Sequence, residues 1–318
     1  MDLESAKRIH DGILDGVETV IFGKRDKISL VICALMCRGH VLLEDVPGTG
    51  KTMLAKAIAA LVGCECTRIQ FTPDLLPSDI TGINFFDQKK SDFVLRKGPV
   101  FTNILIADEI NRTTPRTQSA LLEAMNEFQA TIDGKTYPLP VPFFVIATQN
   151  PIESQGTFPL PEAQTDRFLI KISLGYPERE YEKTMLDEYR TSEPISKLSP
   201  VCTGSEIAGL YDVIRSVKVS DAAKDYILDI VAAVRENEKI RFGTSPRGTL
   251  ALMRMAQTVA AVSGRDYVIP EDVKASAVPV LSHRIVRQSH NSLRLTDTNE
   301  VLIEYILDSV KVPTGPNA

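Results

Sequence analysis

The sequence lacks any hydrophobic run long enough to cross a membrane. Its longest apolar stretch, residues 30–37, is far shorter than the roughly 20 residues that a membrane-spanning helix needs. Residues 1–8 (MDLESAKR) also lack the apolar core that a secretory signal contains. We therefore expect a cytoplasmic protein with no membrane insertion.

An excess of positive charge is also missing. The formal net charge is -5 and the pI is about 5.6, which argues against a dominant surface for nucleic acid or anionic lipid. Internal repeats and low-complexity tracts are absent as well. The composition is that of an ordinary soluble globular protein whose length suits two domains.

Cysteine is scarce, and its odd count of five suits reduced thiols. Cys33, Cys37 and His40 could be read as metal ligands. However, Cys33 and Cys37 stand one helical turn apart inside an apolar run, so we favour small buried side chains over a metal site.

A glycine-containing turn joins a short apolar strand to a helical run at residues 41–62. The strand is Val-Leu-Leu, and the predicted nucleotide-binding residues follow it: Pro47, Gly48, Thr49, Gly50, Lys51, Thr52 and Met53. Backbone N–H groups of such a loop point at phosphate oxygens, the lysine reaches the β- and γ-phosphates, and the Thr52 hydroxyl can ligate Mg²⁺. The strict phosphate-loop pattern has glycine where this chain has Asp45.

Two carboxylates, Asp108 and Glu109, end a second aliphatic strand. Behind a phosphate loop, this pair predicts a metal site at Asp108 and a water-activating base at Glu109. Asn150 follows a later apolar strand and could orient the same water. The guanine-reading motif Asn-Lys-x-Asp is absent, so we expect ATP and Mg²⁺ as the ligands.

Strands alternate with helices over residues 1–192, which predicts an α/β core with a parallel sheet flanked by helices. Residues 83–95 and 130–137 predict two hairpins, the second with an Asp-Gly turn. Residues 193–204 resemble a linker, and helical periodicity over residues 205–318 predicts an all-helical lid domain.

The chain resembles the MoxR family of AAA+ ATPases, in the helix-2-insert clade with magnesium chelatase motor subunits. The matching motifs are residues 39–52, 107–112, 118–125 (QSALLEAM), 147–151 (ATQNP), 160–168 and 244–247. The resemblance implies that Asn150 is sensor 1, Arg167 the arginine finger and Arg247 the sensor-2 arginine. It also identifies residues 83–95 as the helix-2 insert and residues 130–137 as the pre-sensor-1 hairpin.

The resemblance further implies a ring-shaped oligomer, a hexamer, which remodels a partner protein that carries a von Willebrand factor A domain. Two rival functions stay open: a nucleic-acid translocase and the motor of a metal chelatase. Against the translocase, the lysines of the two hairpin tips are balanced by aspartates (Lys89, Lys90 and Lys135 against Asp87, Asp92 and Asp133), whereas single-strand grooves interleave basic and aromatic residues.

Overall fold

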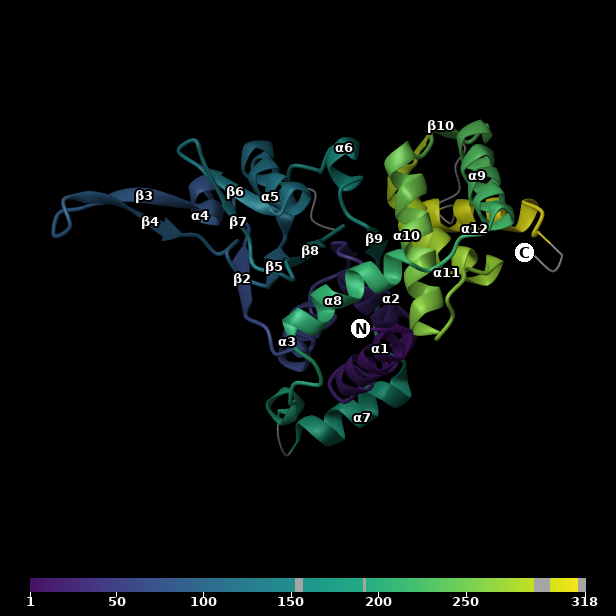
Figure 1. Cartoon of the computed structure of the whole chain (residues 1–318), viewed down its shortest axis with the longest axis horizontal. Coiled ribbons are helices and arrows are strands. Elements are labelled where there is room, and N and C mark those ends of the chain that lie inside the picture. The colour runs from purple at the N-terminus through teal and green to yellow at the C-terminus, as the bar shows by residue number, and fades with distance from the viewer. Residues whose placement is uncertain (152–156, 191–192, 289–297, 314–318) are drawn as a thin grey trace.

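A five-stranded parallel sheet forms the centre of the molecule. The computed structural model describes residues 1–151, 157–190, 193–288 and 298–313, and its sheet runs in the order β2-β5-β8-β1-β9 (Figure 1). The strands are β1 (Val41–Glu44), β2 (Cys66–Gln70), β5 (Ile104–Asp108), β8 (Phe144–Gln149) and β9 (Ile170–Ile172). Because all five are parallel, the residues that follow β1, β5 and β8 meet at one edge.

Alternate residues of the central strands bury opposite faces of the sheet, as the two-residue period of a strand requires. Leu42, Leu105 and Val145 pack with α5 (Pro115–Glu127), which contributes Leu121, Leu122 and Met125 to that face. Their neighbours Leu43, Ile106 and Ile146 belong to a second apolar cluster with α2 (Arg25–Met36) and α3 (Lys51–Val62). With helices on both faces, the predicted α/β core is confirmed.

The first helix, α1 (Leu3–Glu18), packs against α2, α3 and the second half of the chain. Ile9 and Ile13 are fully buried on one side of α1, and the Asp2 carboxylate caps the helix by accepting the Ser5 N–H at 2.9 Å. Apolar residues recur at helical spacing along α1, which places Ile9 and Ile13 on one face.

Two antiparallel hairpins extend from the core. The longer one, β3 (Gly82–Asp87) with β4 (Asp92–Lys97), follows α4 (Pro77–Thr81) and projects away from the body at the left of Figure 1. The shorter one pairs β6 (Gln129–Ile132) with β7 (Lys135–Pro138). Asn84 Nδ2 of the first donates to Asp133 Oδ2 of the second at 2.9 Å, so the hairpins are tied together at the base of the projection.

The second half of the chain is mainly helical. Its helices are α6 (Glu162–Thr165), α7 (Arg179–Tyr189), α8 (Gly204–Arg215), α9 (Asp221–Glu236), α10 (Pro246–Val262), α11 (Pro270–Leu281) and α12 (Asn299–Ser309), with 3₁₀ turns η2 (Pro194–Lys197) and η3 (Ser282–Arg284). A further 3₁₀ turn, η1 (Ile110–Arg112), follows β5 in the first half. A two-stranded antiparallel sheet, β10 (Ile240–Phe242) with β11 (Val286–Arg287), is added to these helices and was not predicted. None of the helices in the described ranges is long and apolar enough to span a bilayer.

The helices after α8 pack onto the amino-terminal helices rather than standing apart from them. α10 contacts α1, α2 and α8, while α11 contacts β9 at the edge of the central sheet. Figure 1 shows this helical group at the right, on the side opposite the projecting hairpin. The expected boundaries at residues 192/193 and 204/205 stay a prediction. Residue 192 and residues 314–318 lie outside the described residues.

Candidate active site

The predicted phosphate loop connects β1 to α3 at the carboxyl edge of the sheet. Gly48 and Gly50 adopt φ angles of 86° and 85°, in the left-handed region that glycine occupies without a steric penalty. The first N–H groups of α3 have no partners within the helix and add the partial positive charge of its N-terminus. Lys51 Nζ donates to the backbone carbonyls of Asp45 at 2.7 Å and Val46 at 3.3 Å.

The remaining loop residues complete the turn between β1 and α3. Thr49 Oγ1 donates to the Val46 carbonyl at 3.2 Å, which closes the turn. Thr52 is the second residue of α3, directly after Lys51, and Pro47 begins the turn. Burial lowers the pKa of Lys51, and the neighbouring carboxylates oppose that shift. An amine already partly removed from water and held by carbonyls is suited to a polyanion.

Asp45 explains the departure from the strict phosphate-loop pattern. Its side chain is 4% exposed and accepts three hydrogen bonds from the turn after β9. Oδ1 accepts from Ser173 Oγ at 2.7 Å and Gly175 N at 3.0 Å, while Oδ2 accepts from Leu174 N at 2.6 Å. A glycine cannot make these contacts, so Asp45 joins the phosphate loop to the segment that leads into α7.

Asp108 and Glu109 stand together at the end of β5, and Thr148 of β8 joins them. Thr148 Oγ1 donates to Asp108 Oδ1 at 2.5 Å and accepts from the Glu109 N–H at 2.8 Å. Glu109 itself has a φ of 57°, an uncommon backbone conformation for a residue with a side chain. The Thr148 hydroxyl therefore holds the Asp108 carboxylate beside the Glu109 backbone, as hydrogen-bonding groups that orient ligands do at metal sites.

Three further polar residues reach the same carboxylates. Arg68 of β2 donates to Asp108 Oδ2 through Nη2 at 2.6 Å and through Nε at 3.1 Å. Glu109 Oε2 accepts from Gln70 at 2.7 Å and from Arg112 at 3.0 Å. Sequence reasoning missed these roles. For Gln70 a signal was present, since it ends β2 and pairs with Asp108, whereas Arg68 lies within β2 and Arg112 in η1.

The buried Asn150 follows β8 at this carboxyl edge, next to the strand end that carries Thr148. The edge thus combines the Lys51 amine, the first N–H groups of α3, the Thr52 hydroxyl and two carboxylates. This donor set fits a nucleoside triphosphate with Mg²⁺, for which Thr52 and Asp108 would supply oxygen atoms.

A cavity of about 380 Å³ adjoins the phosphate loop. Its walls come from the loop, from the segment between α1 and α2, and from the start and one side of α7. The lining includes Ile21, Phe22, Met53, Tyr176, Tyr181, Met185 and Tyr189. Largely apolar walls beside a phosphate site suit a planar base. Met53 was expected to contact nucleotide, whereas the α1–α2 segment and α7 were not.

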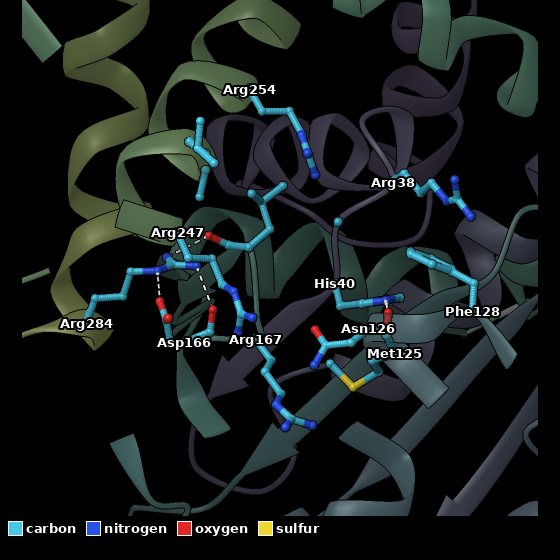
Figure 2. Close-up of a pocket in the computed structure, with 14 residues that line it drawn as sticks. Arg38, His40, Met125, Asn126, Phe128, Asp166, Arg167, Arg247, Arg254 and Arg284 are labelled. Carbon is cyan, nitrogen blue, oxygen red and sulfur yellow. Dashed lines mark hydrogen bonds and ion pairs between the residues drawn. The ribbon is translucent and has the colours of Figure 1, made fainter. Parts of the chain in front are cut away.

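Arg167 and Arg247 lie in a different place, at the amino edge of the sheet. Together they line a cavity of about 240 Å³, which we call the arginine pocket, with Arg38, Arg254 and Arg284 (Figure 2). Its lining includes residues just before β1 and just before β9, so it lies at the opposite end of these strands from the chain's own phosphate loop. Among the described contacts, the side chains of Arg167 and Arg247 make no hydrogen bond or ion pair, and Asp166, the pocket's acidic residue, pairs with Arg284.

Comparison with known proteins identifies the family. Residues 40–170 match the ATPase family associated with various cellular activities (AAA), and residues 232–303 match an AAA lid domain. The chaperone MoxR1 of Mycobacterium tuberculosis is 40% identical over 306 residues, covering 93% of this chain and 80% of that protein. The chain belongs to the MoxR family of AAA+ ATPases.

Other relatives of this MoxR-family chain agree. The Bacillus subtilis protein YeaC is 46% identical over 305 residues, covering 96% of this chain and 95% of that protein. A crystal structure from Cytophaga hutchinsonii superimposes with a TM-score of 0.89 at 37% identity and covers 98% of both chains. The expected fold, an AAA core with a parallel sheet and a lid, is therefore confirmed.

Proposed function

We propose that this MoxR-family protein hydrolyses ATP with Mg²⁺ at sites shared between neighbouring subunits of a hexameric ring, and uses the energy to remodel a partner protein. The observation that carries the proposal is the separation of charges within one chain. The phosphate loop and carboxylates occupy the carboxyl edge of the sheet, whereas Arg167 and Arg247 occupy the amino edge. A head-to-tail contact would bring the two edges of adjacent copies together, and such contacts generate rings when they close.

On the phosphate-loop side, Lys51 would leave the carbonyls of its own loop and neutralise the β- and γ-phosphates. Thr52 and Asp108 would hold Mg²⁺, which when bound neutralises charge on the phosphate oxygens. Glu109 would polarise the attacking water and accept its proton as the water oxygen bonds to the γ-phosphorus. The bond from the γ-phosphorus to the bridging oxygen breaks, releasing ADP and phosphate. Asn150 would orient the same water.

On the arginine side, Arg167 and Arg247 would act on the nucleotide of the adjacent subunit. Negative charge spreads over the transferring phosphoryl oxygens in the transition state, and a guanidinium aimed at them lowers the barrier. Neither arginine is paired with an acid among the described residues, so neither would have to break an ion pair to do this.

The projecting β3–β4 hairpin is the best candidate for contact with a client. Phe86 is 53% exposed and Phe93 68% exposed, and their rings stack edge to face at 5.5 Å between centroids. Exposed aromatic side chains of this kind suit an apolar polypeptide segment. The family resemblance adds a von Willebrand factor A domain protein as the expected partner. The hairpin tip balances Lys89 and Lys90 with Asp87 and Asp92, which does not favour nucleic acid.

Mixed oligomers test the shared site. Arg167→Ala should bind ATP but hydrolyse it slowly, and Lys51→Ala should fail to bind it. Mixing the two inactive variants should restore activity at interfaces that pair an intact Lys51 with an intact Arg167. Arg116→Ala, which removes an exposed arginine outside the arginine pocket, is the matched control. If two-tag co-purification demonstrates mixed oligomers and no activity returns, the shared site is wrong.

A further inference from the structure

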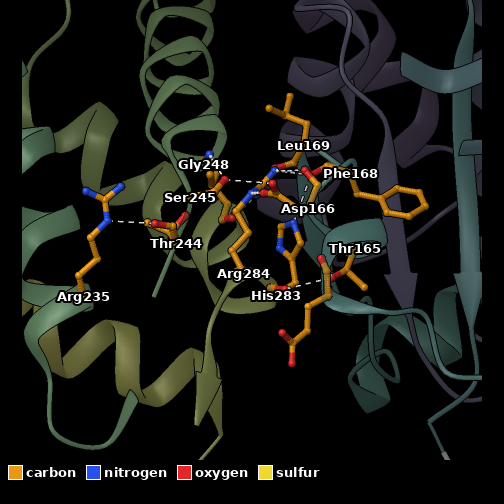
Figure 3. Close-up of polar contacts among 12 residues, drawn as sticks. Thr165, Asp166, Phe168, Leu169, Arg235, Thr244, Ser245, Gly248, His283 and Arg284 are labelled. Carbon is orange, nitrogen blue, oxygen red and sulfur yellow. Dashed lines mark hydrogen bonds and ion pairs between the residues drawn. The ribbon is translucent and has the colours of Figure 1, made fainter. Parts of the chain in front are cut away.

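Asp166 stands at the joint between the core and the helices that follow it. It ends the short helix α6 and directly precedes Arg167. Its carboxylate accepts from Arg284 Nε at 2.8 Å through Oδ1, and from Ser245 Oγ at 3.0 Å through Oδ2. Both donors come from the second half of the chain, Ser245 from the start of α10 and Arg284 from η3, as Figure 3 shows.

Arg284 is buried deeply for an arginine, with 9% of the residue exposed. Besides Asp166, its guanidinium donates to the backbone carbonyls of Asp166, Phe168 and Leu169, and to that of Val280 (Figure 3). Burial lowers the pKa of Arg284 to about 10, and the Asp166 carboxylate opposes that shift. The Arg284 guanidinium thus uses its five N–H donors, and most of these bonds attach residues 166–169 of the core to η3.

Ser245 connects the same carboxylate to the other arginine. Its hydroxyl caps α10, accepting the Gly248 N–H at 3.4 Å, and Arg247 lies two residues further on, in the first turn. Packing at this helix start is tight: a Cβ added at Gly248 would lie 2.0 Å from Thr244 Oγ1 and 2.8 Å from Arg284 Cδ. The start of α10 therefore has little freedom to move relative to Arg284.

Asp166 is thus the one carboxylate, among the described residues of the arginine pocket, that contacts both segments on which its two candidate phosphate-binding arginines stand. We propose that Asp166 is a positioning residue, which holds Arg167 of the core and Arg247 of α10 at a fixed separation so that both reach the same neighbouring nucleotide. This rests on the proposed function. It adds that the joint between core and lid sets the geometry of the arginine pair, and that loosening the joint slows hydrolysis in the adjacent subunit.

The first test compares Asp166→Ala and Asp166→Asn with Asp266→Asn, which neutralises an aspartate in an exposed ion pair with Lys218. Asp166→Ala should bind a fluorescent ATP analogue within twofold of wild type, because its own phosphate loop lies at the opposite edge, while kcat falls tenfold or more. Asp166→Asn keeps an acceptor for one donor and should fall less. Asp266→Asn should match wild type. If Asp166→Ala does not fold, Asp166→Asn still gives the comparison, and a kcat equal to that of Asp266→Asn would overturn the proposal.

A second pair of variants addresses the Ser245 contact. Ser245→Ala removes the hydrogen bond to Asp166 together with a helix cap, whereas Ser220→Ala removes only the equivalent cap from α9, where Ser220 Oγ accepts the Ala223 N–H. We expect kcat to fall severalfold in Ser245→Ala and to stay unchanged in Ser220→Ala. Equal kcat values in the two variants would remove Ser245 from the proposed linkage.

Mixed oligomers separate positioning of the arginines from a general defect. Asp166→Ala mixed with Lys51→Ala should regain activity, because the first supplies an intact phosphate loop and the second an intact arginine pocket. Asp166→Ala mixed with Arg167→Ala should stay inactive, since every arginine pocket is then impaired. If Arg167→Ala complements Lys51→Ala but Asp166→Ala does not, the positioning role of Asp166 is wrong while the shared active site stands. If neither variant complements Lys51→Ala in proven mixed oligomers, both the shared active site and the role of Asp166 are wrong.

Discussion

Replacing Asp45 by asparagine should destabilise the protein by a predictable amount. The carboxylate accepts from Leu174 N on one oxygen and from Ser173 Oγ and Gly175 N on the other. Asparagine offers one acceptor oxygen, and its NH₂ group must face either Leu174 N or Gly175 N. Leu174 is 1% exposed, so its N–H cannot find water. An unpaired buried donor costs about 1–3 kcal/mol, and we expect the free energy of unfolding to fall by about 2 kcal/mol.

Urea unfolding without nucleotide measures this change. Ser173→Ala is the matched control, because it removes one hydrogen bond of the same carboxylate from an exposed residue and should cost less than about 1 kcal/mol. Asp45→Gly, which restores the strict phosphate-loop glycine, should be less stable than Asp45→Asn. Loosening this turn should also weaken nucleotide binding severalfold, since Tyr176 lines the adjoining cavity. Unfolding curves for Asp45→Asn that coincide with those of Ser173→Ala would refute the reasoning.

Three further predictions concern other parts of the molecule. Burial lowers the pKa of His40 to about 4 from 6.5, and the neutral ring donates to Met125 O while accepting from Val145 N. The stabilisation from the neutral ring is therefore full above pH 6.5 and is lost as the pH falls towards 4, by about 3 kcal/mol. The free energy of urea unfolding should depend less on pH in His40→Ala than in wild type over that range, and the same pH dependence in both would contradict this. Single-stranded DNA, titrated at two salt concentrations, should not raise the ATPase rate, and a several-fold, salt-sensitive rise would favour the translocase. Phe86→Ala should weaken stimulation of the ATPase by a denatured model polypeptide, whereas the double Lys89→Ala and Lys90→Ala variant should keep it; the reverse result would exclude the apolar contact.

The core of the fold and the site could be predicted because their signals are local. The phosphate loop is one continuous segment, and the carboxylates directly follow an apolar strand. Once the strands are taken as parallel, Lys51, Asp108 and Asn150 must share an edge. The two hairpins likewise follow from short β-rich runs around polar tips.

The missed features depend on contacts between distant segments. Thr148 and Gln70 contact the carboxylates only through the register of β2, β5 and β8. Tyr181, Met185 and Tyr189 recur every four residues along α7 and line the cavity beside the phosphate loop, but this spacing does not indicate which part of the molecule they face. β10 and β11 are too short to show a strand pattern.

The two departures from simple patterns have the same explanation. Asp45 stands at the position of a motif glycine, and its carboxylate accepts hydrogen bonds from the turn after β9. Asp166, which is next to Arg167 in the sequence, instead pairs with Arg284, more than a hundred residues away. Neither partner is near in sequence, so neither contact could be predicted without coordinates.

The central claim is ATP hydrolysis at the edge formed by Lys51, Asp108 and Glu109, and one measurement tests it most directly. ATP binding and phosphate release are followed in parallel for wild type, Glu109→Gln and Glu123→Gln, the last changing an exposed glutamate of α5. We predict that Glu109→Gln binds ATP within twofold of wild type but turns it over about 10²–10⁴-fold more slowly, while Glu123→Gln behaves as wild type. Near-normal turnover by Glu109→Gln would contradict the account.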